Sequence, residues 1–340
     1  MPDDLRSRGD SMSRLLVLTN NAERASFRQR IGAYLAPMRD GGIEASVETL
    51  PRGMWARSRL FARAGAFDGV LVHKKGLNVV DAHLLRKHAR RIIYNYDDAV
   101  MHSDRRPERR NRSHFVPWRR MVRLSDAVIV GSEHLARLGR AYNRQVHVVP
   151  LGLRVGDYAC DAAKPGDGKV RLVWIGSAST LDYLKALKPV LEAIGARRKD
   201  VVLRQICETF LDLDSMPVEK LAWDSGKRGE YLGTADIGLA PLPDNPFTRG
   251  KCSFKVLEYG AAGLPVVASP VGTNVEHIVE GVTGLLAGGP AQWEAQLMRL
   301  IEDAVLRDKM AQAGRLNAAG YDVNLIAPRL ISVIAQAIER

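Results

Sequence analysis

Three cations and one carboxylate stand close together in the second half of the chain. Arg249, Lys251 and Lys255 fall within seven residues. They lie just before and within the first turn of a helix expected over residues 254–262. Cations at a helix N-terminus oppose the helix dipole, so a bound anion such as a diphosphate would relieve them. Glu258 follows on the same helix face, where it either pairs with Lys255 or accepts hydrogen bonds from ribose hydroxyls. A solvated basic loop is the alternative.

Two adjacent carboxylates, Asp97 and Asp98, follow an apolar strand expected over residues 91–96. At the end of a strand they could hold a metal, act as a base, bind sugar hydroxyls or cap the next segment. A metal is disfavoured because only His102 stands near enough in the sequence to serve as a third ligand. No metal site is therefore expected.

A third candidate is the Gly-Ser-Ala-Ser-Thr segment at residues 176–180, between an expected strand and an expected helix. Glycine allows close backbone approach, hydroxyls donate hydrogen bonds, and a helix N-terminus offers N–H groups to a phosphate. The Gly-Lys-Ser/Thr ending of a P-loop is missing, and so is a G-x-G-x-x-G pattern. The segment is either a phosphate loop or the capped start of a helix.

An alternation of strands and helices must position these candidates. Short apolar runs indicate buried parallel strands, and periodic segments between them indicate helices. In the first half, strands are expected over residues 14–19, 69–73, 91–96, 127–130 and 146–150, and helices over 25–38, 79–89 and 133–142. In the second half, strands are expected over residues 171–176, 201–206, 235–240 and 265–269, and helices over 181–194, 254–262, 293–313 and 325–339. The sequence predicts an α/β protein with two successive parallel sheets.

Length and composition place the domain boundaries. A chain of 340 residues suits two domains of ordinary size, and residues 161–169 have the composition of a linker. The expected parts are a flexible N-terminus over 1–13, an N-terminal parallel-sheet domain over 14–155, a linker over 156–169, a C-terminal parallel-sheet domain over 170–322 and a C-terminal helix over 323–340. Ligands of such sheets bind beyond the carboxyl ends of the strands.

The net charge of +12 is unevenly distributed. Residues 1–155 contain 29 basic and 15 acidic side chains, whereas the remainder contains 21 and 23. The first half is therefore expected to meet an anionic partner. Three widely spaced cysteines indicate a reducing compartment, and no apolar run suits a signal peptide or a bilayer span. A cytoplasmic protein is expected, either free or at the inner face of the plasma membrane.

Much of the basic excess lies between Arg105 and Arg123, a stretch with eight arginines. Phe115, Val116, Pro117, Trp118 and Met121 are interleaved with them. This composition is typical of an interfacial membrane-binding element, which gains about 1 kcal/mol per cation near anionic lipid. A solvated helix is the alternative. Nucleic acid is disfavoured because no nucleic-acid-binding motif is present.

Several segments resemble the donor-binding region of GT-B glycosyltransferases, above all the large retaining family four, the glycosyl transferases group 1. The resemblance covers most of residues 14–320 and is most specific in the second half. It is carried by residues 236–243, 250–259, 261–269 and 281–286, with upstream support from residues 94–99, 125–132, 149–153 and 174–180.

The resemblance implies a GT-B fold, in which two Rossmann-like domains face a central cleft and a C-terminal helix packs back on the N-terminal domain. It makes residues 14–155 the acceptor domain and residues 170–322 the nucleotide-sugar donor domain. It implies transfer of a sugar from a nucleotide-diphosphate (NDP) sugar with retention of anomeric configuration, in cell-surface polysaccharide or glycolipid assembly. It implies that no cofactor is required. The alternatives are an epimerase-like NDP-sugar enzyme, a non-catalytic sugar-nucleotide-binding protein and, as a minor one, a nucleic-acid-binding protein.

The resemblance also implies residue roles. Glu258 matches the second Glu of the family's paired motif, which contacts ribose, while the first Glu of that motif falls at Gly250. Lys255 falls where relatives carry a lysine close to the donor diphosphate. Asp97 falls where many members carry a His that touches the transferred sugar, and Asp98 matches the Asp after it.

The catalytic candidates are thus Asp97, Asp98 and Lys255. The donor-binding candidates are Gly176, Ser177, Ser179, Thr180, Arg249, Lys251, Ser253, Phe254, Lys255 and Glu258. The candidates on the acceptor and membrane side are Asn20, Arg28, His73, Lys74, Lys75, Arg109, Arg112, Trp118 and Arg119. The expected partners are an NDP-sugar, an acceptor glycan or lipid-linked acceptor, and an anionic membrane surface.

Overall fold

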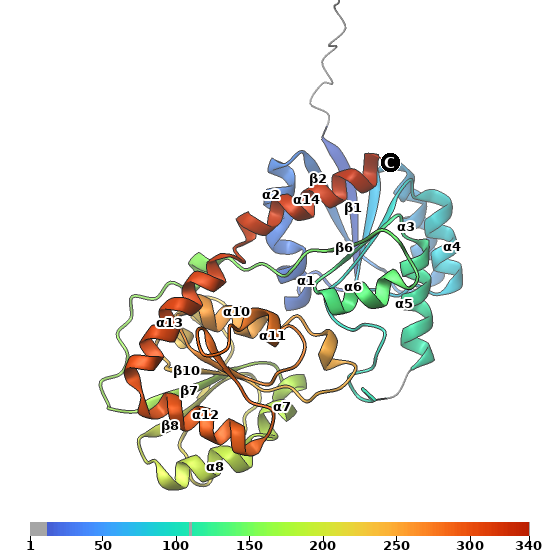
Figure 1. Cartoon of the computed structure of the whole chain (residues 1–340). Helices are drawn as coiled ribbons and strands as arrows, with labels where there is room; N and C mark the ends of the chain where they lie inside the picture. Colours follow the sequence, from blue (N-terminus) through green and yellow to red (C-terminus); the bar gives the residue numbers. More distant parts are fainter. Residues whose placement is uncertain (1–11, 109–110, 340) are drawn as a thin grey trace, which may run out of the picture. The chain divides into compact units, whose positions relative to one another are not determined.

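The computed structural model describes residues 12–108 and 111–339, which form two compact units (Figure 1). Unit 1 contains the described residues up to Gly152 together with those from Val323 onward, and unit 2 contains Leu153–Asp322. Each unit is built on a six-stranded parallel sheet. The predicted α/β class with two parallel sheets is confirmed.

The sheet of unit 1 has the order β2-β1-β3-β4-β5-β6. Its strands are β1 (Ser13–Thr19), β2 (Ile43–Thr49), β3 (Gly69–His73), β4 (Ile92–Tyr96), β5 (Ala127–Val130) and β6 (Val146–Val148). Its helices are α1 (Ala25–Arg30), α2 (Leu35–Asp40), α3 (Met54–Ala62), α4 (Val79–His88), α5 (Arg112–Leu124), α6 (Glu133–Arg140) and α14 (Val323–Glu339). Short 3-10 turns lie at Gly32–Tyr34 and Arg63–Ala66.

The C-terminal helix α14 belongs to the core of unit 1. Alternate residues of the central strands, such as Val17 and Leu71, form one buried face of the sheet, and Leu330 and Ile334 of α14 pack into the same cluster. Burial of this apolar surface holds the end of the chain on the first sheet. The expectation that the C-terminal helix packs back on the N-terminal domain is confirmed.

The sheet of unit 2 has the order β12-β11-β10-β7-β8-β9. Its strands are β7 (Val170–Ile175), β8 (Val201–Ile206), β9 (Val218–Leu221), β10 (Ile237–Ala240), β11 (Val266–Ala268) and β12 (Gly284–Leu286). Its helices are α7 (Leu181–Lys185), α8 (Lys188–Arg197), α9 (Arg228–Gly233), α10 (Phe254–Ala261), α11 (Asn274–His277), α12 (Pro290–Glu302) and α13 (Ala304–Ala319). Its 3-10 turns lie at Val155–Tyr158, Ala178–Thr180 and Thr248–Gly250.

Two helices predicted in the second half are each divided in the structure. The helix predicted over 181–194 is interrupted before Pro189, because proline lacks an N–H group and restricts the residue before it. The helix predicted over 293–313 is interrupted at Asp303, whose side chain accepts a hydrogen bond from the amide of Leu306 and so begins α13.

The first half differs from the prediction in three places. The helix predicted over 25–38 divides into α1 and α2 around the turn at Gly32–Tyr34. Strand β2 and helix α3 were not predicted. Strand β2 is an edge strand whose exposed and buried residues alternate, a weaker signal than the apolar runs of the central strands.

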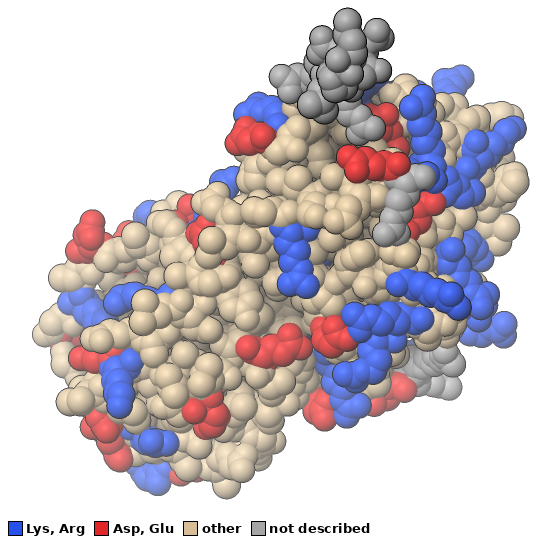
Figure 2. Space-filling view, turned by 45° about the horizontal axis from the view of Figure 1, so that its top comes forward, with Lys and Arg blue, Asp and Glu red and all other residues tan. Residues whose placement is uncertain are grey.

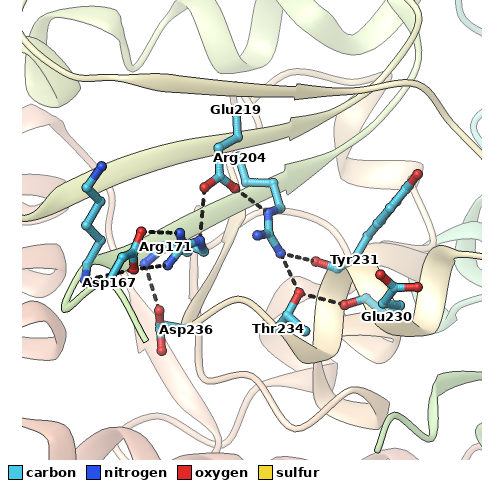
Figure 3. Close-up of polar contacts among 9 residues, drawn as sticks. Asp167, Arg171, Arg204, Glu219, Glu230, Tyr231, Thr234 and Asp236 are labelled. Carbon is cyan, nitrogen blue, oxygen red and sulfur yellow. Dashed lines mark hydrogen bonds and ion pairs between the residues drawn. The ribbon is translucent and has the colours of Figure 1, made fainter. Parts of the chain in front are cut away.

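The segment predicted as a linker over 156–169 is bound to unit 2. Tyr158 is buried in the core of this unit. Asp167 forms two hydrogen bonds, of 2.9 and 2.7 Å, with the guanidinium of Arg171 on β7 (Figure 3). Lys164 donates to Asp236, just before β10, at 2.8 Å. The linker prediction is therefore wrong in part, because long-range contacts hold a segment whose composition is typical of a flexible chain.

The same network continues across the sheet (Figure 3). Glu219 on β9 accepts from the Nε of Arg171 at 3.0 Å and from the Nε of Arg204 at 2.7 Å. Arg204 also donates to the hydroxyl of Thr234 at 2.7 Å and to the carbonyl of Tyr231 at 2.8 Å. Both arginines are buried, so Glu219 joins three strands through charge-assisted hydrogen bonds.

Candidate active site

Both sheets have a topological switch point, where the chain reverses its direction of winding. In unit 1 it lies between β1 and β3, and in unit 2 between β7 and β10. Ligands of open parallel sheets bind beyond the carboxyl ends of the strands at such points. In unit 2 the strand ends lead into the loop after Ile175 and into the segment between β10 and α10, and most of the predicted donor residues lie there.

Lys255 stands in the first turn of α10. Its ammonium group lies 4.5 Å from the centre of the Trp174 ring, a cation–π contact. Burial, and after it the charge of Lys251, lowers the pKa of Lys255 to about 7, while Glu258 acts in the opposite direction. Within the described ranges, no carboxylate lies at ion-pair distance from this amine. The site therefore concentrates positive potential without neutralising it, as an anion-binding site requires.

Glu258 lies one turn further along α10 and is buried. Its Oε1 accepts a hydrogen bond from the hydroxyl of Tyr158 at 2.8 Å and lies 3.7 Å from a guanidinium nitrogen of Arg228. Burial raises the pKa of Glu258, and Arg228 and Tyr158 counteract this. Among the described residues, no hydrogen bond engages Oε2, which leaves one carboxylate oxygen for a hydroxyl.

Sequence reasoning missed Tyr158 and Arg228. The guanidinium carbon of Arg228 lies 4.5 Å from the centre of the Tyr158 ring, so the two side chains stack beside Glu258. Tyr158 belongs to the predicted linker, and Arg228 begins the short helix α9. No local signal marks either residue, because their common feature is contact with a carboxylate far away in the sequence.

Ser253 precedes α10 with a backbone φ of 29°, outside the region that side-chain-bearing residues favour. Its hydroxyl is buried and makes no hydrogen bond within the described part of the chain. Such strain and such an unpaired polar group concentrate at functional sites. The next residue, Phe254, packs against the core beneath the helix.

The other two predicted cations differ in their surroundings. Arg249 is exposed and forms two hydrogen bonds with Asp244, of 2.6 and 3.0 Å. Lys251 lies 5.1 Å from the ring centre of Phe247 and 5.9 Å from that of Tyr183. Asp244 thus neutralises Arg249, which makes Arg249 a poorer diphosphate ligand than Lys251 or Lys255.

The segment at residues 176–180 forms a capped turn. The Gly176 amide donates to the carbonyl of Ile206 at 3.0 Å, and the Ser177 amide donates to the hydroxyl of Thr180 at 3.2 Å. The hydroxyls of Ser177 and Ser179 lie 3.0 Å apart. Two of the amides expected to face a phosphate are therefore used internally. The amides of Ala178 and Ser179 lie at the start of the turn, where backbone N–H groups have no carbonyl partner within the helix.

In unit 1 the structure brings Lys74 together with the two aspartates. Its ammonium lies 2.7 Å from Asp97 Oδ1 and 2.6 Å from Asp98 Oδ2, and its backbone φ is 58°. Burial tends to lower the pKa of Lys74, but Asp97 and Asp98 together raise it above its usual range. Among the described residues, no group of three or more potential ligands is arranged to hold a metal ion. The aspartates and the lysine form one charged cluster at the carboxyl ends of β3 and β4.

His73 and Arg30 lie beneath this cluster. Burial lowers the pKa of His73 to about 4, with Asp97 acting against it, so the imidazole is neutral at physiological pH. Arg30, which sequence reasoning missed, is buried and donates to Asn95 at 3.1 Å and to the carbonyl of Val149 at 2.6 Å. Three further acceptor-side candidates lie at the surface of the unit, with Lys75 half-buried and Asn20 and Arg28 exposed.

The prediction that Trp118 faces a membrane is wrong. Its side chain is only 2% exposed and packs edge-on against Tyr142 and Tyr96. The apolar face of α5 therefore belongs to the core. Arg112 is exposed at the start of α5, and Arg119 lies 5.8 Å from the ring centre of Phe115. Arg109 lies outside the described residues.

Solved structures define the class of fold. The Anabaena protein HepE, in complex with UDP and glucose, matches with a TM-score of 0.72 and 15% identity over 95% of this chain and 100% of that one. A glycosyltransferase of Rickettsia africae matches with a TM-score of 0.73 and 12% identity over 96% and 99%. The two Rossmann-like units thus have the GT-B fold of glycosyltransferases.

The sequence comparisons find a family match within unit 2. Residues 159–303 match the family described as glycosyl transferases group 1. The D-inositol 3-phosphate glycosyltransferase of Salinispora arenicola is 37% identical over 106 residues, which are 31% of this chain and 22% of that protein. The chain thus matches less than a quarter of the length of this curated relative.

Proposed function

We propose that the protein is a retaining glycosyltransferase that moves a sugar from an NDP-sugar to an acceptor. The observation that carries the proposal is the pair Lys255 and Glu258 on α10, at the switch point of a unit that matches the glycosyl transferases group 1 family. One side chain is a half-buried lysine whose amine has no carboxylate partner among the described residues. The other is a buried carboxylate with one oxygen left for a hydroxyl.

In this proposal unit 2 binds the donor. Lys255, with Lys251 beside it, contacts the diphosphate, and Oε2 of Glu258 accepts hydrogen bonds from the ribose. The amides of Ala178 and Ser179 are further donors to the phosphates. A UDP-sugar is the first donor to test, because the Anabaena structure with the same fold contains UDP and glucose.

The chemistry needs charge stabilisation above all. When the bond between the sugar and the phosphate breaks, negative charge grows on the departing nucleoside diphosphate. Fixed cations near that phosphate stabilise the transition state more than the ground state. We propose that the acceptor attacks from the face that the phosphate leaves and that the phosphate helps to remove the acceptor's proton. This route retains configuration and requires neither a protein nucleophile nor a metal or other cofactor.

Unit 1 is the proposed acceptor unit. The cluster of Lys74, Asp97 and Asp98 offers both carboxylate oxygens and an ammonium at the carboxyl edge of its sheet, a combination suited to hydroxyls and to anionic groups. We assign Asp97 to the transferred sugar or the acceptor. A glycan or lipid-linked acceptor of cell-surface polysaccharide or glycolipid assembly, met at the cytoplasmic face of the membrane, suits the basic charge of this half of the chain.

The decisive experiment compares UDP binding and donor turnover in three variants. Lys255→Ala and Glu258→Ala are expected to abolish the thermal shift caused by UDP, because the shift depends on the affinity of the folded state. The control is Lys185→Ala, whose amine pairs with Asp182 at 2.9 Å on the surface of the same unit. A panel of nucleotides and NDP-sugars then identifies the base and the sugar. Unchanged UDP affinity in both site variants would refute the proposed donor site.

A non-catalytic sugar-nucleotide-binding protein is the second candidate, because Gly250 stands where the family has the first Glu of its pair. Radiolabelled donor separates the candidates. Transfer to an acceptor, or slow release of free sugar, marks a transferase. A labelled sugar that changes its stereochemistry while bound to the nucleotide marks an epimerase. Binding without any turnover marks the non-catalytic protein.

A further inference from the structure

The first turns of α3 and α4 expose four large apolar side chains. Met54 is 57% and Trp55 79% exposed at the start of α3, while Val79 is 65% and Val80 51% exposed at the start of α4. An exposed tryptophan beside an exposed methionine and two exposed valines is unusual on a protein that meets only water. These four residues are called the Trp55 patch below.

The two halves of the Trp55 patch are held side by side. Arg57, in the first turn of α3, forms an ion pair of 2.6 Å with Asp81, in the first turn of α4. The Arg57 Nε also donates to the carbonyl of Pro51 at 2.9 Å, and Asn78 donates to Asp81 at 2.9 Å. Asp81 is buried, so the pair acts as an internal link. The starts of the two helices that carry the four apolar side chains are therefore joined.

The surroundings of the patch are basic. Helices α3, α4 and α5 contain a single acidic residue, Asp81, and it is buried beneath the patch. Arg57 pairs with Asp81 and Arg86 pairs with Asp126. The other cations of these helices are Arg59, Lys87, Arg112, Arg119, Arg120 and Arg123. Arg120 of α5 donates to the carbonyl of Leu77 at 2.6 Å, which fixes α5 beside the start of α4. Figure 2 shows Lys and Arg side chains gathering toward the right-hand edge of the visible face.

The patch also lies beyond the carboxyl ends of the strands, as the candidate site of unit 1 does. Helix α3 begins after the carboxyl end of β2, and α4 begins after the carboxyl end of β3. Val79 is four positions after Lys75, and a chain of that length spans at most about 14 Å. A bilayer or other surface that binds the patch would therefore lie close to Lys74 and to the aspartates that it binds.

We propose that the Trp55 patch inserts into the interface of an anionic lipid bilayer and presents unit 1 to a lipid-linked acceptor. This inference rests on the proposed function for the nature of the acceptor. Tryptophan favours the boundary between headgroups and acyl chains, and the surrounding arginines meet the lipid phosphates. The patch takes over the role that the sequence suggested for Trp118, whose ring is buried in the core.

Vesicle binding of the full chain tests the proposal. Trp55 is exposed, Trp223 is half-buried and the other three tryptophans are buried. The part of the emission blue shift on adding vesicles that Trp55→Ser removes therefore reports the transfer of Trp55 into lipid. Co-flotation with vesicles of phosphatidylcholine and phosphatidylglycerol measures binding. Trp55→Ser is expected to lower the partition coefficient by about tenfold or more. Leu316→Ser is the matched control, because Leu316 is equally exposed, at 79%, on α13 of unit 2.

The result that overturns the proposal is equal vesicle binding by Trp55→Ser and the original chain. Two other outcomes overturn it as well. One is binding to duplex DNA without any emission shift on vesicles, and the other is self-association through the patch without vesicle binding. UDP binding is measured on the same preparations. Loss of vesicle binding with intact UDP binding supports the proposal, whereas absence of UDP binding in every variant refutes the proposed function alone.

Discussion

The hydroxyl of Tyr158 donates a hydrogen bond of 2.8 Å to the carboxylate of Glu258, across one hundred residues of sequence. The tyrosine comes from the segment predicted as a linker over 156–169, and the glutamate comes from the helix that carries the candidate donor site. Because Glu258 is buried, an unpaired carboxylate there would carry a large desolvation cost. The bond both stabilises unit 2 and fixes which carboxylate oxygen remains available to a ligand.

Replacement of the tyrosine tests this link. Tyr158→Phe removes the donor to Glu258 and leaves the ring beside Arg228. We expect unfolding free energy to fall by about 1–3 kcal/mol, and UDP affinity to fall with it, because Glu258 is less well fixed and less easily ionised. Urea unfolding and UDP titration measure the two effects. Tyr231→Phe is the control, since Tyr231 contacts Arg204 only through its backbone carbonyl. Equal behaviour of both variants would contradict the assignment.

The lowered pKa of Lys255 predicts that nucleotide binding depends on pH. At about pH 7, roughly half of the molecules of the ligand-free protein have an uncharged Lys255, since its pKa is about 7. A bound diphosphate favours the charged amine and raises its pKa, so binding takes up a proton above that pH. The affinity for UDP should therefore fall with rising pH, by at most about tenfold per pH unit.

The control for this dependence is Lys255→Arg, whose guanidinium stays charged throughout. Calorimetric titrations between about pH 6 and pH 9 compare it with the original chain, which cancels the ionisation of UDP itself. Proton uptake is read from buffers of different ionisation enthalpy. The same pH dependence in both proteins would show that Lys255 does not titrate in the site.

His277 predicts a loss of stability in mild acid. Burial lowers the pKa of this residue to about 4, below its ordinary value of 6.5. The unfolded chain therefore binds more protons than the folded one between these values, so stability falls as pH decreases from 6.5 to 4. The full effect of one such histidine is about 3 kcal/mol. His277→Phe keeps an aromatic ring against Tyr321 and should flatten this slope.

Urea unfolding of the two proteins at about pH 7 and pH 5 measures the difference. His73, with a pKa also near 4, adds a second contribution in unit 1, so part of the acid loss is expected to remain. His83→Gln, a substitution of an exposed histidine of unit 1, serves as the control. An unchanged slope in His277→Phe would mean that this histidine does not govern the acid sensitivity of unit 2.

Glu219 predicts a large loss of stability on replacement. It accepts hydrogen bonds from the buried Arg171 and Arg204, and it is the carboxylate that neutralises Arg204. Glu219→Ala should cost about 3–5 kcal/mol, because it leaves a buried charge without its partner. Asp182→Ala, which breaks the exposed pair with Lys185, should cost less than about 1 kcal/mol. Chemical denaturation tests both values, and a small loss for Glu219→Ala would show that the network is of little consequence.

The sequence predicted the architecture because its central strands are buried on both faces. Runs such as residues 69–73 and 127–130 are almost wholly apolar, and this pattern occurs where helices cover a parallel sheet on both sides. Edge strands such as β2 and β9 lack that pattern and were missed. Helix ends were also missed where one residue interrupts a periodic segment, as Asp303 does.

The candidate site could be predicted in outline. Lys255 and Glu258 stand near each other in the sequence, so their spacing on one helix face was readable. Tyr158 and Arg228 could not be predicted from the sequence, because contacts between distant segments leave no local signal. The structure also weakens the predicted donor-binding roles of Arg249 and Gly176. The guanidinium of Arg249 binds Asp244, and the amide of Gly176 donates to the carbonyl of Ile206.

By itself the sequence determined two parallel-sheet domains, the helix that carries Lys255 and Glu258, and the excess of positive charge in the first half. These properties follow from local periodicity and from composition, which the order of residues contains directly. Only the tertiary structure decided that Trp118 is buried and Trp55 exposed, that Lys74 binds Asp97 and Asp98, and that Tyr158 supports Glu258. Burial and pairing depend on which segments meet in space, and the free energy of a charged or aromatic side chain depends on that neighbourhood rather than on its place in the chain.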